Sequence, residues 1–164
     1  LSKGQFIIPL RQELILTEQY LYIQNLRYMD FVDYEITYES SWEDHGAEIP
    51  KLTIQPVVEN IFVHGLTNQM CHIHLNVSIQ NNTIYISISD NGSGIPREKL
   101  TELNRSIRDF KTARYSFGLP SINHRISLLY GENYGLTIKS SPENGTTVTI
   151  AIPDKKSTLG GNIK

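Results

Sequence analysis

The hydrophobic pattern near the start of the chain predicts a helix that begins at Pro9. Proline suits the first position of a helix, and the apolar residues that follow it fall on two helical faces. One face holds Leu10, Leu14, Thr17, Leu21 and Tyr28, and the other holds Ile15, Tyr22 and Leu26. A helix with two apolar faces can contact two partners. We favour a helix packed on the chain's own sheet over one that also contacts an upstream or neighbouring helix.

Alternating apolar and polar positions predict three strands in the middle of the chain. The first alternation covers residues 32–38 and is followed by a polar loop. Pro56 then opens a second helix, whose apolar face holds Val57, Val58, Ile61 and Phe62. The second and third alternations, residues 71–79 and 84–88, flank a turn at Asn81 and Asn82 and predict an antiparallel hairpin.

The second half of the chain predicts two more helices and two more strands. Pro96 starts a short helix through Leu103, and residues 104–116 lack a clear period, which predicts a loop. Pro120 opens a helix that stops at Gly131, and strands at residues 136–138 and 148–152 follow. Helices interleaved with hairpin-paired strands predict an α+β fold. We expect a two-layer sandwich in which helices cover one face of a mixed, mostly antiparallel sheet.

Length and composition restrict the class of protein. With 164 residues, of which 39% are hydrophobic and 20% charged, the chain predicts one globular domain that is neither disordered nor embedded in a membrane. Its net charge of −2 argues against a dedicated nucleic-acid binder. The single cysteine, Cys71, excludes an intrachain disulfide. Because the chain does not begin with Met and shows no signal peptide, we expect a fragment of a longer protein.

Asp90 is the first candidate for chemistry. It shares strand parity with Ile84, Ile86 and Ile88, so its carboxylate points toward the apolar side at the end of the strand. Burial of a carboxylate is costly without a donor, and Gly92 and Gly94 let the backbone approach a ligand closely. Such an aspartate can accept a hydrogen bond from an amino-bearing flat ring such as adenine, and it can equally cap an ordinary turn.

The second candidate is the pair Glu59 and Asn60 in the second helix, with His64 one turn beyond. Carboxylate and amide oxygens near a phosphate suit Mg²⁺, a hard cation that keeps several waters and takes few protein ligands. Considered alone, the pair is better explained as two solvated residues on a helix face.

The third candidate is the start of the helix at Pro120, which follows Ser116, Phe117, Gly118 and Leu119. A helix N-terminus after glycine presents free amides to anionic oxygens. Upstream, Arg105, Arg108, Lys111 and Arg114 form a predicted basic loop that can fold over a triphosphate. Considered alone, these features are better explained as an ordinary loop-to-helix junction and a solvated loop.

Thr146 is the fourth candidate. It shares parity with Val148 and Ile150, so its hydroxyl points inward, where it can bond Asp90 or a ring beside it. The alternative is a threonine chosen for strand propensity at a hairpin.

The order of these four motifs resembles the GHKL ATP-binding superfamily, which contains histidine kinases, gyrase-type topoisomerases, heat-shock chaperone ATPases and mismatch-repair ATPases. Glu59 and Asn60 resemble the N box, DNGSGI and SFGL the two glycine boxes, and GTT the terminal threonine motif. The flanks IPLRQELILTEQYLYIQNLRY, IPKLTIQPVVENIFVHG and ISLLYGENYGLTIKSSPENGTTVTIAIP look like sensor histidine kinases of the LytS/YesM type, from about Pro9 to Pro153.

The resemblance implies a role for each matching residue. Asn60 would coordinate Mg²⁺ beside the N-box acid Glu59, and these two would be the catalytic residues. Asp90 would contact the adenine amino group. The implied nucleotide contacts are Asn60, His64, Asp90, Gly92, Gly94, Ile95, Gly118, Leu119 and Thr146. Val63 stands where the family commonly has Lys, Ser116 replaces the first glycine of the second box, and Pro120 is unusual after it. These departures concern catalytic strength and lid geometry more than the fold.

The resemblance also implies an activity, a domain organisation and partners. The chain would be the catalytic domain of a two-component sensor histidine kinase, which transfers the γ-phosphoryl of ATP to a histidine on an upstream dimerisation helix. The phosphoryl would then pass to a response regulator receiver domain. Residues 1–30 would form a connecting helix, 31–154 the ATP-binding domain and 155–164 a flexible tail. The domain would be cytoplasmic, in a bacterial kinase dimer anchored to the membrane through its upstream part. A nucleotide-binding switch without transfer activity and a GHKL-type ATPase are the alternatives.

Overall fold

The computed structural model describes residues 6–29, 31–39, 41–109 and 118–155. Its centre is a five-stranded sheet with the order β2-β4-β5-β7-β6. The strands β2 and β4 pair in parallel and the other three ladders are antiparallel, which confirms the predicted mixed sheet. The strands are β2 (Val32–Tyr38), β4 (Cys71–Gln80), β5 (Thr83–Asp90), β6 (Gly135–Ser140) and β7 (Thr146–Pro153).

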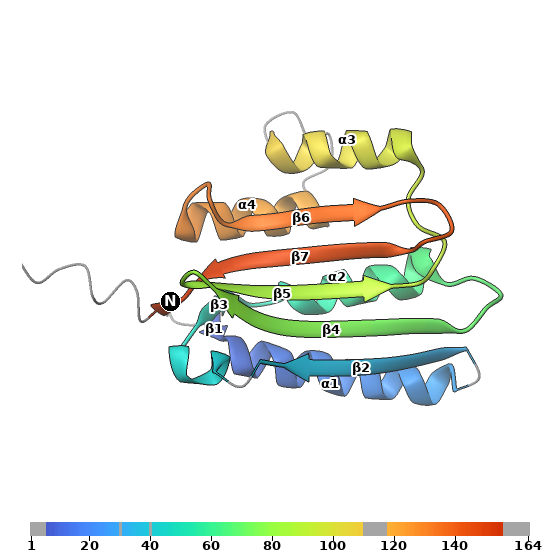
Figure 1. Ribbon diagram of the computed structural model, residues 1–164, viewed down its shortest axis with the longest axis horizontal. Helices are drawn as coiled ribbons and strands as arrows, with labels where there is room; N and C mark the ends of the chain where they lie inside the picture. The colour runs from blue at the N-terminus through green and yellow to red at the C-terminus, as the bar shows by residue number, and fades with distance from the viewer. Residues whose placement is uncertain (1–5, 30, 40, 110–117, 156–164) are drawn as a thin grey trace, which may run out of the picture.

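Helices cover one face of this sheet, the face behind the strands in Figure 1, and one of them lies beyond the β6 edge in that view. They are α1 (Leu10–Arg27), α2 (Ile54–Asn60), α3 (Arg97–Arg108) and α4 (Leu119–Tyr130). Alternate strand residues point toward the helices and form the core, among them Ile73, Leu75, Ile84, Ile86, Ile88, Ile150 and Ile152. This arrangement confirms the two-layer sandwich. Each helix in the described ranges is too short or too polar to cross a bilayer.

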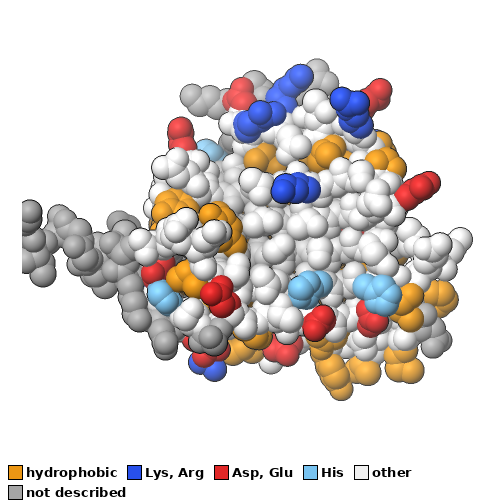
Figure 2. Space-filling view, viewed as in Figure 1, with side chains coloured by type: hydrophobic (Ala, Val, Ile, Leu, Met, Phe, Trp, Pro, Cys, Tyr) orange, Lys and Arg blue, Asp and Glu red, His pale blue; other side chains and the backbone are white. Residues whose placement is uncertain are grey.

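The opposite face of the sheet is polar. Its residues include the exposed His72 and His74 of β4 and the half-buried Ser87 and Thr149 of β5 and β7. Figure 2 shows few hydrophobic side chains over the middle of this face. Because a slip of one residue would bring these polar side chains into the core, the alternation specifies the register of the strands.

The helix α1 packs into the domain through the first of its two apolar faces. Leu10, Leu14, Thr17 and Leu21 are buried, whereas Ile15, Tyr22 and Leu26 on the second face are exposed. A short antiparallel pair, β1 (Ile7–Pro9) with β3 (Glu48–Pro50), holds the start of the helix and was not predicted. The helix therefore packs within its own domain and leaves its second apolar face exposed.

Two segments that were predicted as loops are partly helical. The helix α3 extends to Arg108, so the prediction of a loop for residues 104–108 is wrong. The spacing of Leu100, Leu103 and Ile107 is helical, and these residues pack on the core, so this signal was present in the sequence. In the predicted polar loop, Trp42 begins a 3-10 helix (Trp42–His45) and is buried.

Candidate functional site

A cavity of about 710 Å³ opens between the end of β5 and the helices α2, α3 and α4. This volume is in the range of about 300–1,000 Å³ that small-molecule sites occupy. Eight predicted nucleotide contacts line it: Asn60, His64, Asp90, Gly94, Ile95, Gly118, Leu119 and Thr146. The structure thus brings together four motifs that are far apart in sequence. Glu59 and Gly92 are not among the lining residues.

Asp90 is the last residue of β5 and lies partly buried in the cavity. Its Oδ1 accepts a 2.8 Å hydrogen bond from the backbone N–H of Gly92. Burial raises the pKa of the Asp90 carboxyl, and the backbone N–H groups of Gly92 and Thr146 oppose that rise. A carboxylate has about four acceptor positions, so Asp90 keeps capacity for a donor inside the cavity.

Three glycines allow backbone segments to meet around Asp90. A Cβ atom on Gly92 would lie 2.0 Å from the carbonyl oxygen of Gly65, and one on Gly94 would lie 2.0 Å from that of Ser141. A Cβ atom on Gly145 would lie 1.9 Å from the carbonyl oxygen of Asp90 itself. Neighbouring backbone occupies the space that a side chain would need, so glycine is required at these positions. Gly92 shapes the turn but does not itself line the cavity.

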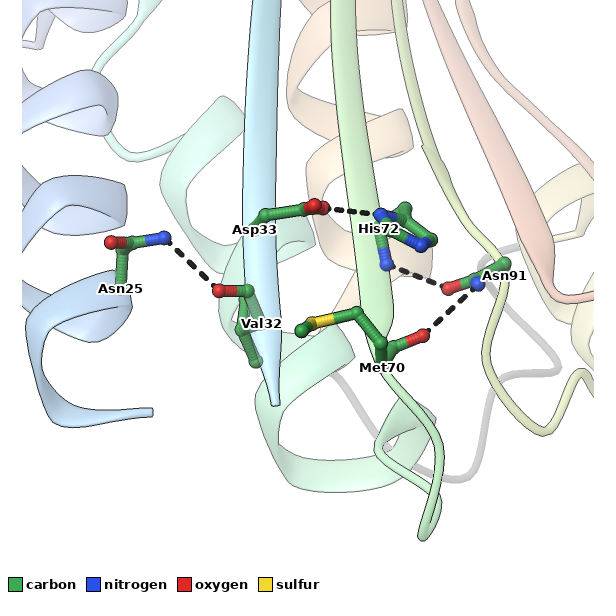
Figure 3. A network of polar contacts seen from close by, with 6 residues as sticks. All are labelled: Asn25, Val32, Asp33, Met70, His72 and Asn91. Carbon is green, nitrogen blue, oxygen red and sulfur yellow. Dashed lines mark hydrogen bonds and ion pairs between the residues drawn. The ribbon is translucent and has the colours of Figure 1, made fainter. Parts of the chain in front are cut away.

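Asn91 fastens the same turn to the neighbouring strand. Its Oδ1 accepts a 2.7 Å hydrogen bond from the backbone N–H of His72, and its Nδ2 donates to the carbonyl of Met70 at 3.1 Å. Figure 3 shows the Asn91 side chain directed at the start of β4, where His72 in turn pairs with Asp33 of β2. Adjacent residues of the DNGSGI motif therefore have different structural roles. Asp90 faces the cavity, and Asn91 holds the turn against β4.

The end of α2 contributes Asn60 and His64 to the cavity. The helix continues directly into a π-helical turn (Ile61–Gly65), which carries His64. Glu59 instead accepts a 2.8 Å hydrogen bond from Nε2 of Gln55 on its own helix. Val63 is 70% exposed, and it is not among the lining residues.

The donor set at this end fits a magnesium ion that is held mainly by a ligand. Within the described ranges, no three His, Cys, Asp or Glu side chains gather as a metal-binding group. Mg²⁺ commonly keeps several waters and is bound through few protein ligands plus substrate phosphates. The amide oxygen of Asn60, beside a cavity large enough for a phosphate chain, is compatible with that coordination.

Gly118 and Leu119 bring the start of α4 to the cavity. Pro120 occupies the first turn of this helix, where a missing N–H is tolerated because no intrahelical acceptor is available there. The unusual proline therefore fits a regular helix start. The basic residues predicted for the preceding loop divide into two groups. Arg105 and Arg108 lie on α3, which corrects that prediction, whereas Lys111, Arg114, Ser116 and Phe117 lie outside the described residues.

Thr146 lies directly opposite Asp90 in the β5–β7 ladder. Its hydroxyl group is 2.8 Å from Oγ of Ser140, and its backbone N–H is the group that faces the Asp90 carboxylate. The possible hydroxyl bond to Asp90 is therefore absent, because Ser140 lies opposite Thr146 on the other side, in β6. Ser140 also accepts a 2.8 Å bond from the N–H of Ile95, and so links two lining residues.

Lys99 of α3 lines the cavity and was not among the predicted site residues. Its place shortly after Pro96, on the helix that follows the glycine turn, is the signal that could have identified it. It brings a positive charge to the cavity mouth, where an anionic ligand would be attracted.

Comparison with known proteins gives one family match and several relatives. The family model described as histidine kinase-, DNA gyrase B- and HSP90-like ATPase matches residues 47–156. Sensor protein kinase HptS of Staphylococcus aureus (strain USA300) is 29% identical over 153 residues, which are 93% of this chain and 29% of that protein. The same kinase of strain NCTC 8325 matches equally. The chain therefore spans about three tenths of the length of these curated relatives.

Solved structures share the fold. The catalytic domain of histidine kinase ThkA has a TM-score of 0.62 at 17% identity, over 90% of this chain and 94% of that one. The histidine kinase domain of a blue-light-activated kinase from Erythrobacter litoralis EL346 has a TM-score of 0.58 at 17% identity, over 94% and 66%. ThkA in complex with the response regulator protein TrrA has a TM-score of 0.57 at 16% identity, over 90% and 41%.

Proposed function

The chain belongs to the histidine kinase-, DNA gyrase B- and HSP90-like ATPase family, and from this premise we propose that it is the ATP-binding catalytic domain of a sensor histidine kinase. The cavity at the end of β5 binds ATP, and the γ-phosphoryl group is transferred to a histidine on a separate helix. The similarity to sensor protein kinase HptS and the shared fold of histidine kinase catalytic domains support this function.

The observation that carries the proposal is the place of Asp90 in the cavity. The partly buried carboxylate at the end of β5 accepts a hydrogen bond from the amino group of the purine. Apolar lining residues, among them Ile88 and Ile95, surround the purine ring. Because the carboxylate is already held by Gly92, its direction does not have to be fixed when the ligand binds. Adenine, which carries an exocyclic amino donor, is favoured over a purine that carries a carbonyl in its place.

At the other end of the cavity, Asn60 offers its amide oxygen to Mg²⁺, and the start of α4 at Gly118 and Leu119 receives the phosphates. When bound, the ion neutralises charge on the phosphate oxygens. The positive Lys99 adds to this neutralisation from the cavity mouth. Phosphoryl transfer is governed mainly by positioning and charge stabilisation, so these residues need to orient the nucleotide rather than react with it.

The transfer itself needs a nucleophile but no water-activating base. A neutral imidazole nitrogen attacks the γ-phosphorus, the bond from phosphorus to the bridging oxygen breaks, and its electron pair leaves with ADP. The phosphohistidine then releases its remaining imidazole proton to solvent. We place the accepting histidine on an upstream dimerisation helix of the same kinase. We place the next acceptor on a response regulator receiver domain, and the complex of ThkA with the response regulator protein TrrA supports this second placement.

The finer assignment is to the LytS/YesM type of sensor kinase, supported by the flanking motifs around α1, α2 and β6–β7. In this organisation residues 1–30 connect the dimerisation helix to the ATP-binding domain at 31–154. The exposed second face of α1, with Ile15, Tyr22 and Leu26, is available to such a helix. The domain would be cytoplasmic in a kinase anchored to the membrane through its upstream part.

Calorimetric titration with ATP tests the proposal. We expect saturable binding that strengthens on addition of Mg²⁺, and an Asn60→Ala variant in which the Mg²⁺ effect is lost. The exposed Asn68→Ala variant is the matched control and should bind like the wild type. Absence of ATP binding by the folded wild-type chain would contradict the proposal.

A second experiment separates the kinase from its alternatives. The chain is incubated with ATP, Mg²⁺ and a separately prepared histidine-bearing dimerisation segment of a sensor kinase of this type. Phosphohistidine on that segment supports the kinase. ATP binding without transfer favours a nucleotide-dependent switch, and ATP hydrolysis by the chain alone favours an ATPase.

A further inference from the structure

The turn that precedes α2 is held by a buried carboxylate from α1. Glu13 is 1% exposed, although many residues of the same helix are exposed to solvent. Its two oxygens accept hydrogen bonds from three successive backbone N–H groups, those of Leu52 at 3.2 Å, Thr53 at 2.9 Å and Ile54 at 3.1 Å. These groups have no intrahelical acceptor at the start of α2, so Glu13 serves as the cap of a helix 40 residues downstream.

The same turn is held from its other side by Arg125 of α4. Nη1 of Arg125 donates to the carbonyl of Lys51 at 2.8 Å, and Nη2 donates to that of Leu52 at 2.7 Å. Leu52 has φ of +59°, a conformation that a residue with a branched side chain adopts only when its surroundings enforce it. Glu13 and Arg125 together hold Leu52 in this conformation, because Glu13 binds the N–H groups of the turn and Arg125 binds its carbonyls.

Both helices attached to this turn end at the nucleotide cavity. The helix α2 has seven residues and runs from Ile54 at the turn to Asn60, a rise of about 9 Å at 1.5 Å per residue. The helix α4 runs from Gly118 and Leu119 at the cavity to Arg125 at the turn. Asp90, in contrast, is fixed by the central strand β5. A shift of the turn therefore moves Asn60 relative to both Asp90 and the start of α4.

We infer that Glu13 is a positioning residue for the metal and phosphate end of the cavity, and that Arg125 completes its action. By holding the first turn of α2, Glu13 sets where Asn60 and His64 lie relative to Asp90. It also ties this position to α1, so that the helix packed at the start of the domain and the nucleotide cavity are mechanically joined. The inference rests on the proposed function, because it assigns Glu13 a part in Mg·ATP binding.

Two ligands distinguish positioning from general structural support. Adenosine probes the Asp90 end alone, whereas Mg·ATP also engages the Asn60 end. In Glu13→Gln the side chain keeps its size, but only one of its two terminal atoms can still accept a hydrogen bond from a backbone N–H. We expect Mg·ATP affinity to fall about tenfold because Asn60 is displaced from the metal and phosphates, an effect below the roughly hundredfold that a misplacement of about 1 Å can cost. Adenosine affinity, followed by amide NMR shifts, should remain unchanged.

The matched control is Glu18→Gln, which makes the same change at an exposed position of the same helix. It should bind both ligands like the wild type. The amide spectrum of Glu13→Gln without ligand should show shifts from Leu52 to Gly65 and an unaltered Asp90. If Glu13→Gln fails to fold, Arg125→Gln, which alters a partly exposed side chain, is expected to show the same selective loss and decides the question.

A folded variant with unchanged Mg·ATP affinity would overturn the inference, and so would equal losses for both ligands. If the wild-type chain binds adenosine and Mg·ATP and either of these results is found, the role of Glu13 is refuted. The proposed function is then still supported. A wild-type chain that does not bind Mg·ATP is a different failure, because it contradicts the proposed function and the inference together.

Discussion

The backbone N–H of Gly92 donates a 2.8 Å hydrogen bond to Oδ1 of Asp90 across the turn that ends β5. The bond holds the carboxylate in one direction and leaves other acceptor positions open to the cavity. Gly92 can make this contact because its missing Cβ leaves room for the carbonyl oxygen of Gly65, 2.0 Å from where that atom would be. Recognition of a ligand donor and closure of the turn thus depend on the same two residues.

Asp90→Asn should separate ligand binding from stability. Burial penalises the charged carboxyl, and an asparagine oxygen can still accept the N–H of Gly92. We expect an unchanged or higher melting temperature, together with a loss of ATP affinity of about ten- to a hundredfold, as for a hydrogen bond to a charged group. Thermal unfolding and calorimetry measure the two effects, with the exposed Glu132→Gln as control. A lower melting temperature with unchanged ATP affinity would refute this assignment.

Nucleotide affinity should fall on acidification, and the fall should begin at a higher pH than it would for an aspartate with the usual pKa. The pKa of Asp90 in the folded chain lies above its usual value of 3.8. As pH falls through the folded pKa, the carboxylate is protonated and its hydrogen bond from the purine amino group weakens. Its effect on stability has the opposite sign: Asp90 lowers stability above its folded pKa, and this cost disappears as pH falls through that pKa toward 3.8.

The measurement for this pH dependence is the ATP dissociation constant as a function of pH, alongside the carboxyl ¹³C shift of Asp90. The affinity and the shift should change together, and Asp90→Asn should remove this part of the affinity profile. A carboxyl midpoint at or below 3.8 would contradict the prediction.

Gly94 and Gly46 provide a matched pair for the close backbone approach at the cavity. Both have positive φ, +68° and +58°, but a Cβ on Gly94 would clash with the carbonyl of Ser141, whereas one on Gly46 would meet nothing within 4 Å. Gly46→Ala should cost about 1–2 kcal/mol, the strain of a left-handed residue. Gly94→Ala should cost about 1–3 kcal/mol more because of overpacking. Urea unfolding tests this, and equal losses would show that the approach is not tight.

Tyr130 should contribute to stability through its hydroxyl group, which donates a 2.6 Å hydrogen bond to the carbonyl of Glu48. Burial, with the nearby Glu48 charge, raises the pKa of Tyr130 from 10.0 to about 12. This contribution is therefore complete below pH 10 and is lost as pH rises toward 12. Tyr130→Phe should cost about 1 kcal/mol at neutral pH and reduce the alkaline loss. Tyr22→Phe, at an exposed position, should change neither.

Much of the sheet and of the cavity could be predicted because the deciding information is local. Strict alternation from Cys71 to Ile79, and again along β5, requires one face to be buried, and the parity of Asp90 then follows. The Asn81 and Asn82 turn adopts positive φ at both residues, which asparagine tolerates. The positions of Gly92 and Gly94 directly after this strand identified the turn at the cavity.

The parts that could not be predicted depend on partners that are distant in sequence. Glu13 is polar in a helical pattern, and its acceptor role becomes visible only when Leu52, Thr53 and Ile54 are brought to it by the fold. Ser140 likewise competes for the Thr146 hydroxyl because β6 pairs with β7. In each case a contact with another element overrides what the local sequence indicates.

A crystal structure of the chain with ADP and Mg²⁺ would show whether Asp90 and Asn60 hold the two ends of the nucleotide. We expect the purine amino group within hydrogen-bond distance of Asp90, the phosphates near Gly118 and Leu119, and the ion on the Asn60 side. A nucleotide bound elsewhere, or a purine in this cavity without contact to Asp90, would contradict this expectation.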